Sequence, residues 1–187
     1  LDAYENAIQK SPRKDHRHRI EHMGNWLSTP ERMQRLVRSA IIAIPNISIA
    51  YYVGDAILDC LGEKRLAKAF PFRTLLKNGV TIAGGSDAPG YWPVDPLRDI
   101  SACVSRRMRW GDVLVPEERI SVGEAFAMHT TTAAFVGFEE NLKGTLEVGK
   151  LADIAVLAED PFEVQPEKIK DLKVEMTIVG GEIKYQA

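Results

Sequence analysis

Two polar side chains stand where a parallel β/α protein would place its chemistry. His22 ends a strand candidate at 18–22, and Asp87 follows a second candidate at 80–83. In such folds the carboxyl ends of the strands form the rim of the ligand site. An imidazole suits zinc-like metals, and a carboxylate can bind a metal or move a proton. The pair is therefore interpreted as a metal ligand and a general base, with a strand-end histidine and a turn aspartate as the alternative.

The remaining histidines favour other interpretations. His16-x-His18 has a familiar zinc spacing, but the polar turn at 11–15 precedes it and no apolar strand leads into it. We therefore expect an exposed loop there. His129 lies on the apolar face of a predicted helix, which favours a core or interface histidine over a ligand.

The first two thirds of the chain alternate apolar runs with amphipathic stretches, which is typical of β/α units. The predicted strands are 18–22, 41–44 and 80–83. One predicted helix follows a capping segment at 28–31, with Pro30 at an early helical position. Another carries Leu97, Ile100 and Val104. Apolar residues at Leu1, Tyr4 and Ile8 predict a further helix that is entered part-way, because neither an N-cap nor an initiator Met precedes it.

Aromatic residues fall in two segments that we expect to be loops after strands. Tyr51 and Tyr52 lie in the predicted loop from 46 to about 62, and Trp92 lies in the loop from 88 to 96. Aromatic side chains there could line a substrate pocket, and ordinary packing explains them equally well.

The last third of the chain changes character. Ser121-x-x-Glu124 is a capping box, and Gly137 suits the end of the helix it opens. Beyond this point the chain turns to β structure, with the Gly180-Gly181 pair as a hairpin signal. We therefore divide the chain into a β/α part at 1–137 and a β part at 138–187.

Composition limits the partners and the setting. The 187 residues carry 24 basic and 26 acidic side chains, for a formal charge of −2, so nucleic acid and anionic membranes are not expected as partners. No apolar run is long enough for a membrane helix. Cys60 and Cys103 form no Cys-x-x-Cys motif, and we expect both to be buried and reduced. The expected location is the cytoplasm.

Four stretches together resemble the C-terminal part of the metal-dependent amidohydrolase superfamily, specifically its amidohydrolase-3 branch. They are Arg-Ile-Glu-His at 19–22, Gly-Gly-Ser-Asp at 84–87 followed by Pro96-Leu97, His-Thr-Thr-Thr-Ala-Ala at 129–134, and Gly-Thr-Leu-Glu-Val-Gly-Lys-Leu-Ala-Asp at 144–153. The match covers nearly the whole chain. One departure is Thr132, where relatives often carry Asn.

This resemblance implies an α/β fold: strands six to eight of a distorted (β/α)8 barrel of the TIM type, plus part of a small β-sandwich. His22 matches the metal-binding histidine that closes strand six. Asp87 matches the aspartate after strand eight, which in relatives touches the metal, takes a proton from the nucleophilic water and hands it to the leaving nitrogen. The implied parent is a metal-dependent hydrolase of amide, N-acyl or cyclic amide bonds that uses a metal-activated water, with zinc as the expected metal. Tyr51, Tyr52 and Trp92 are the candidates for substrate contact.

The family's other metal ligands have no counterpart in this sequence. His16-x-His18 cannot replace the histidine pair after strand one, because it precedes strand six. A barrel needs roughly 250 residues, so the chain is interpreted as a fragment that binds metal weakly and is inactive alone. The alternative is a non-catalytic module that oligomerises or binds the missing N-terminal portion.

Overall fold

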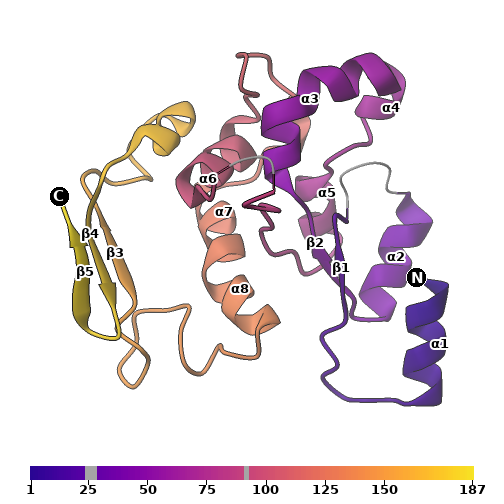
Figure 1. The fold of residues 1–187 in the computed structure, drawn as a ribbon. Coiled ribbons are helices and arrows are strands. Elements are labelled where there is room, and N and C mark those ends of the chain that lie inside the picture. The colour runs from indigo at the N-terminus through magenta and orange to yellow at the C-terminus, as the bar shows by residue number, and fades with distance from the viewer. Residues whose placement is uncertain (24–28, 91–92) are drawn as a thin grey trace.

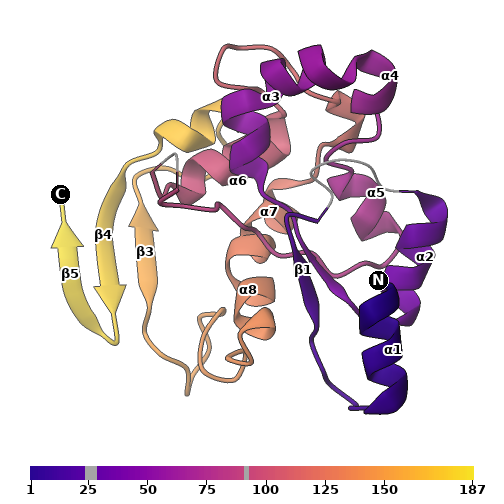
Figure 2. The same cartoon turned by 45° about the vertical axis from the view of Figure 1, so that its right-hand side comes forward.

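The structure is a computed structural model that describes residues 1–23, 29–90 and 93–187. It is an α/β protein whose three parts are visible in Figure 1. Two short parallel strands with their helices lie on one side, and an antiparallel sheet near the C-terminus lies on the other. Three helices, α6 (Pro96–Ser105), α7 (Val122–His129) and α8 (Thr131–Val136), lie between them, as Figure 2 also shows.

The first part begins with two helix–strand pairs. These elements are α1 (Asp2–Lys10), β1 (Arg19–Glu21), α2 (Pro30–Arg38) and β2 (Ile42–Ile44). β1 and β2 pair in parallel, with Arg19 opposite Ile42. At α2 the hydroxyl of Thr29 accepts a hydrogen bond from the backbone N–H of Arg32, and Pro30 occupies the first turn, which confirms the predicted cap.

The third predicted strand, at 80–83, is less regular than expected. The segment forms no continuous strand: one isolated parallel bridge joins Ile82 to Ala43 of β2, and a second joins Gly85 to Asn46, just beyond the end of β2. The neighbouring amide of Gly84 donates to the carbonyl of Met128 on α7, at 3.0 Å. A helix end thus holds Gly84 on the side away from β2, while the pairing with β2 is interrupted at Pro45, which has no amide hydrogen to donate.

The predicted loop at 46–62 is wrong, because α3 (Ile47–Leu61) occupies it. Its Ile, Tyr, Val and Gly residues have modest helix propensity, which hid the helix from sequence reasoning. Its buried side chains include Ile47, Ala50 and Ile57, which recur at helical spacing and pack into the core. Tertiary packing therefore decides the structure of this segment, and α3 bends at Val53, where the backbone is non-helical.

The helices that follow complete the packing around the strands. They are α4 (Glu63–Leu66), α5 (Phe72–Lys77), α6 (Pro96–Ser105), the 3-10 turn η1 (Pro116–Glu118), α7 (Val122–His129) and α8 (Thr131–Val136). The capping box of Ser121 and Glu124 is present as predicted. The single helix expected beyond it is divided at Thr130, where the backbone leaves the helical region.

The C-terminal sheet consists of β3 (Ile154–Leu157), β4 (Val174–Val179) and β5 (Glu182–Gln186), with the 3-10 segment η2 (Pro166–Asp171) between the first two strands. Both strand pairs are antiparallel, in the order β3-β4-β5. Gly180 and Gly181 have φ angles of 60° and 85°, which confirms the predicted hairpin. The carboxylate of Asp153 accepts a hydrogen bond from the amide of Gly180 at 2.8 Å, so it holds this turn.

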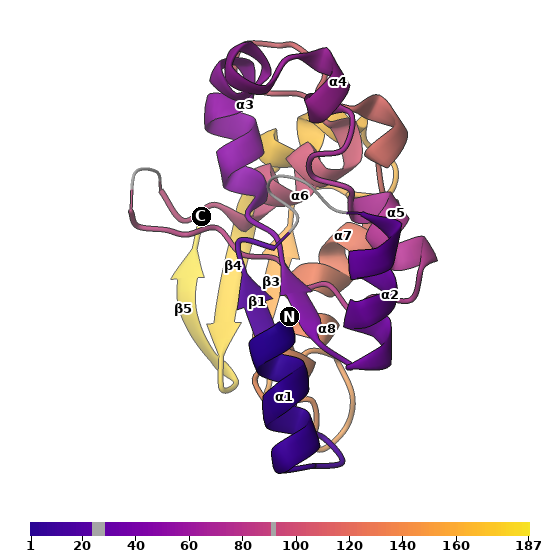
Figure 3. The same ribbon diagram turned by 90° about the vertical axis from the view of Figure 1, so that its right-hand side faces the viewer.

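The core lies on both faces of the parallel strands. Ala43 and Ile82 belong to the main cluster with the helices, while Ile42 and Ile44 pack with Val136 on the opposite face. Figure 3 shows α3 beyond one end of β1 and β2, and α1 toward the other. Among the described residues, no helix has the length and apolar character needed to cross a membrane.

The two cysteines differ in exposure. Cys103 is buried in α6, but Cys60 is exposed on α3, so the expectation that both are buried is wrong for Cys60. Burial raises the pKa of the Cys103 thiol to about 12. Only Cys60 is therefore positioned to react.

Candidate metal and proton-transfer site

His22 stands at the carboxyl end of β1. Its backbone has a left-handed φ of 57°, which is uncommon for a residue other than glycine. The next residue, Met23, donates its amide to the carbonyl of Ile44 at 3.2 Å. The end of β2 thereby fixes the chain directly after His22.

Asp87 stands at the corresponding end of the segment at 80–83, which runs parallel to β2 and is called the third parallel segment below. Its φ is 58°, so it shares the left-handed conformation of His22. Before it, the amide of Gly85 donates to the carbonyl of Pro45 at 3.2 Å. After it, the amide of Ala88 donates to the hydroxyl of Ser86 at 3.2 Å. Strained non-glycine backbone held by surrounding hydrogen bonds is typical of functional sites.

The structure brings these two side chains together. His22 Nε2 lies 3.9 Å from Asp87 Oδ2, and each side chain is 47% exposed. Imidazole nitrogen and carboxylate oxygen are both ligands for a divalent metal of the zinc type. Among the described residues, no group of three or more His, Cys, Asp or Glu side chains is arranged to hold a metal. The donor set therefore fits part of a metal site, and the exposure leaves room for further ligands.

His16 and His18 lie at the other end of β1 from His22. The amide of His18 donates to His16 Nδ1 at 3.0 Å, and the two rings stack with centroids 4.5 Å apart. Both residues are half-buried and belong to the segment that leads into β1. This is the loop position that the sequence favoured over a zinc site, although the loop is more buried than expected.

His129 lies in the last turn of α7, packed against the third parallel segment. A Cβ atom at Gly84 would lie only 2.7 Å from His129 Nε2. That nitrogen is buried and has no hydrogen-bond partner among the described residues. Burial lowers the pKa of His129 to about 4, so the ring is neutral near pH 7. It packs inside the protein, as its apolar helix face predicts.

The predicted substrate-contacting tyrosines lie on α3, which follows β2, and not in a loop. Their rings meet edge to face with centroids 5.0 Å apart. Tyr51 lines a small pocket, whereas the hydroxyl of Tyr52 accepts a hydrogen bond from Arg98 at 2.7 Å. Trp92, the third candidate, lies outside the described residues.

Sequence reasoning missed a buried polar cluster beside these tyrosines. Arg98 and Asp99 begin α6 with side chains only 5% and 1% exposed, and they form an ion pair at 3.1 Å. Ser48 on α3 donates to Asp99 Oδ1 at 2.8 Å. The available signal was the pair of adjacent opposite charges in a helix whose residues are otherwise mostly apolar or small.

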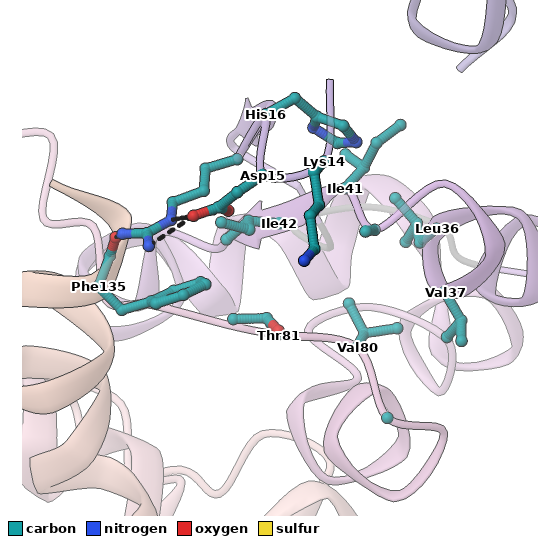
Figure 4. Close-up of a pocket in the computed structure, with 13 residues that line it drawn as sticks. Lys14, Asp15, His16, Leu36, Val37, Ile41, Ile42, Val80, Thr81 and Phe135 are labelled. Carbon is teal, nitrogen blue, oxygen red and sulfur yellow. Dashed lines mark hydrogen bonds and ion pairs between the residues drawn. The ribbon is translucent and has the colours of Figure 1, made fainter. Parts of the chain in front are cut away.

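A cavity of about 190 Å³ lies at the opposite end of the strands. Figure 4 shows its lining, with Lys14, Asp15 and His16 from the approach to β1, and Val80 and Thr81 from the start of the third parallel segment. Because these residues precede the strands while His22 and Asp87 follow them, the cavity is separate from the candidate site.

Comparison with known proteins identifies the family. The model of the amidohydrolase family Amidohydro_3 matches residues 1–185, and the chain belongs to this family. Its sequence is 33% identical to YtcJ of Bacillus subtilis (strain 168), an inferred amidohydrolase, over 97% of this chain and 34% of the relative. It is 29% identical to the N-substituted formamide deformylase of Arthrobacter pascens, over 100% of this chain and 34% of the relative. The chain thus spans about a third of the length of these curated relatives.

Solved structures show the same fold. An uncharacterised metal-dependent hydrolase from Pyrococcus horikoshii OT3 superposes with a TM-score of 0.71 at 24% identity, over 89% of this chain and 33% of that chain. A similar protein from Pyrococcus furiosus has a TM-score of 0.66 at 26% identity, over 87% of this chain and 32% of that chain. The fold of residues 1–187 is therefore that of part of an amidohydrolase.

Proposed function

We propose that residues 1–187 form the C-terminal portion of a metal-dependent hydrolase of carbon–nitrogen bonds other than peptide bonds. The observation that carries this proposal is the approach of His22 and Asp87 to 3.9 Å at the carboxyl ends of parallel segments. Family membership supports hydrolysis, and the formamide deformylase among the relatives supports an amide or N-acyl substrate. Cyclic amides are included in the proposed substrate class.

The proposed architecture is strands six to eight of a (β/α)8 barrel, with part of a β-sandwich at 138–187. It is supported by the three parallel segments, which are too few to close a barrel, and by the chain's coverage of a third of its relatives. The antiparallel sheet β3-β4-β5 would be the portion of the sandwich. The remaining strands would come from a preceding part of the protein.

His22 and Asp87 are the proposed metal ligands of this chain, with zinc as the proposed metal. A catalytic zinc commonly has about three protein ligands and an open position, so at least one further ligand would come from outside residues 1–187. When bound, the metal would polarise the scissile carbonyl and lower the pKa of a water molecule. Residues 1–187 alone would bind metal weakly and would lack hydrolytic activity.

Asp87 is the proposed general base and acid. Its exposed carboxylate would accept a proton from the attacking water and deliver it to the leaving nitrogen. His22 would serve as a metal ligand beside this carboxylate, since its Nε2 lies 3.9 Å from Asp87 Oδ2. Tyr51, Tyr52 and Trp92 are proposed to contact the substrate. The proposed enzyme acts in the cytoplasm on small molecules.

A second candidate function is a non-catalytic module that oligomerises or binds a partner. It is favoured by the exposed apolar side chains of the C-terminal sheet, among them Val156, Val179, Ile183 and Tyr185. Exposed apolar surface of this kind is typical of association surfaces. Under the first proposal, the preceding part of the protein would cover this surface. Under the second, another copy of the chain would do so.

Metal binding separates these candidates. The full-length protein containing residues 1–187 should bind a divalent metal tightly, and His22→Ala should weaken the binding by about 10–100-fold or more. Zinc titrated by calorimetry into residues 1–187 alone should give no tight site. Unchanged metal affinity in full-length His22→Ala would contradict the first proposal, and a stable oligomer without metal would favour the second.

A further inference from the structure

The cavity at the opposite end of the strands from His22 and Asp87 has an apolar wall. Leu36, Ile41 and Val80 line it, and each is at most 3% exposed and belongs to the main core. The wall is therefore an extension of the core, and an apolar group placed against it would be removed from water. The cavity volume of about 190 Å³ lies below the roughly 300–1,000 Å³ of pockets for drug-sized ligands, so it suits a short molecule.

The segment that leads into β1 brings positive charge to this cavity. Residues 13–19 contain four lysine or arginine side chains and one acidic side chain, in a chain whose formal charge is −2. Arg17 is engaged within the fold, because its guanidinium pairs with Asp15 and with Glu140. Both carboxylate oxygens of Asp15 accept hydrogen bonds from Arg17 Nε at 3.0 Å. The charge that is left for a ligand is therefore that of Lys14.

Lys14 extends its side chain into the cavity. Figure 4 shows its ammonium group directed toward Val80 and Thr81. Within residues 1–23, 29–90 and 93–187, this ammonium group has neither a hydrogen-bond partner nor an ion-pair partner. A lysine ammonium carries three donors and no acceptor, so the group that would complete its bonding is an anion.

His16 supplies a second donor among the lining residues. Its Nδ1 accepts a hydrogen bond from the amide of His18 at 3.0 Å, so Nε2 carries the hydrogen in the neutral ring. One ammonium group and one neutral donor suit a carboxylate, which has a single charge. Recognition of phosphate commonly uses the fork of an arginine, and the donors of Arg17 are already engaged.

We propose that this cavity is a binding site for a short aliphatic carboxylate. The carboxylate group binds Lys14, and the hydrocarbon chain packs against Leu36, Ile41 and Val80. The ligand would thus touch the approach to β1, α2 and the start of the third parallel segment together. Because the cavity is separate from the candidate metal site, this inference does not depend on the proposed hydrolase function.

The site is tested by calorimetry with butyrate and the full-length protein. Butyrate should bind to one site, whereas 1-butanol and inorganic phosphate should each bind at least about tenfold more weakly, because one lacks the charge and the other lacks the chain. Lys14→Met keeps the length of the side chain and should weaken butyrate binding by about tenfold or more, since it removes a charged hydrogen bond. Lys10→Met, at the exposed end of α1, is the matched control and should bind butyrate as wild type does.

A second variant tests the cavity without changing its charge. Val37 lines the cavity and is 43% exposed on α2, so Val37→Phe should narrow the cavity, leave the thermal unfolding midpoint unchanged and abolish butyrate binding. The proposal is overturned if butyrate does not bind at millimolar concentration, if phosphate binds equally well, or if Lys14→Met keeps the wild-type affinity. None of these results bears on the hydrolase proposal, which metal binding and turnover decide.

Discussion

Arg17 and Glu140 form an ion pair between distant parts of the chain, with Nη2 of Arg17 2.6 Å from Oε1 of Glu140. The guanidinium also lies 3.9 Å from the ring centre of Phe135 and 4.2 Å from that of Phe138. Its Nε donates to Asp15 at 3.0 Å. The approach to β1 is thereby tied to the end of α8 and the turn after it.

Removing the Arg17–Glu140 ion pair should destabilise the contact between the approach to β1 and the turn after α8. We expect Arg17→Met to lower the thermal unfolding midpoint by several degrees, because the variant loses the ion pairs and the stacking together. Arg13→Met, in the same loop and exposed, is the control. Glu140→Gln should add little to Arg17→Met, because both changes break one interaction. Equal midpoints for Arg17→Met and Arg13→Met would contradict this account.

Gly84 should tolerate no side chain. A Cβ atom there would lie 2.6 Å from Cε1 of His129, which is inside van der Waals contact. Gly84→Ala should therefore lower the free energy of unfolding by about 1–3 kcal/mol in denaturant titration. Gly123→Ala in α7, where the nearest atom to such a Cβ is 3.9 Å away, is the control and should not destabilise. Partial rescue of Gly84→Ala by His129→Ala would confirm the contact, and a neutral Gly84→Ala would refute it.

His129 should make stability depend on pH in a defined window. Burial lowers its pKa from 6.5 to about 4, so the unfolded state binds its proton first as the pH falls. Its contribution is fully present above pH 6.5 and is lost as the pH falls from 6.5 toward 4, by up to about 3 kcal/mol. Urea titrations of His129→Asn should show a flatter profile in this window. A slope identical to that of wild type would exclude the assignment.

The two thiols should react at very different rates. Cys60 is exposed on α3, whereas Cys103 is buried and the pKa of its thiol is raised to about 12. A disulfide reagent at pH 8 should label one thiol quickly in the native protein and both in denaturant. Cys60→Ser should abolish the fast phase. Rapid labelling that persists in Cys60→Ser would show that α6 opens readily.

Patterns of residues close together in the sequence were sufficient to predict several helix starts and the C-terminal hairpin. The Thr29 and Ser121 caps and the Gly180-Gly181 turn depend on hydrogen bonds and backbone angles within a few residues, and all three are present. The prediction of a loop at 47–61 was wrong because the helix there is stabilised by packing partners that are distant in the sequence. The strand expected at 80–83 was overestimated because Pro45, directly after β2, has no amide hydrogen to donate to the carbonyl of Ala83, so the pairing is reduced to isolated bridges.

The candidate site divides in the same way. That His22 and Asp87 lie close together could be predicted, because the ends of parallel strands meet at one edge of a sheet. The burial of Arg98 could not be predicted, because it comes from contacts with Tyr52 and Pro93, which approach through tertiary folding. A charged residue in the first turn of a helix is ordinarily solvated, so its sequence signal was limited to the opposite charge of Asp99 beside it in a helix of mostly apolar or small residues.

The most direct test of the central claim is the rate of amide hydrolysis by the full-length protein with Asp87→Asn. The matched control is Asp59→Asn, an exposed aspartate on α3. If Asp87 carries the proton, Asp87→Asn should lower kcat by about 100-fold or more while Asp59→Asn leaves it unchanged. Wild-type turnover by Asp87→Asn, in a protein that folds normally, would contradict the account.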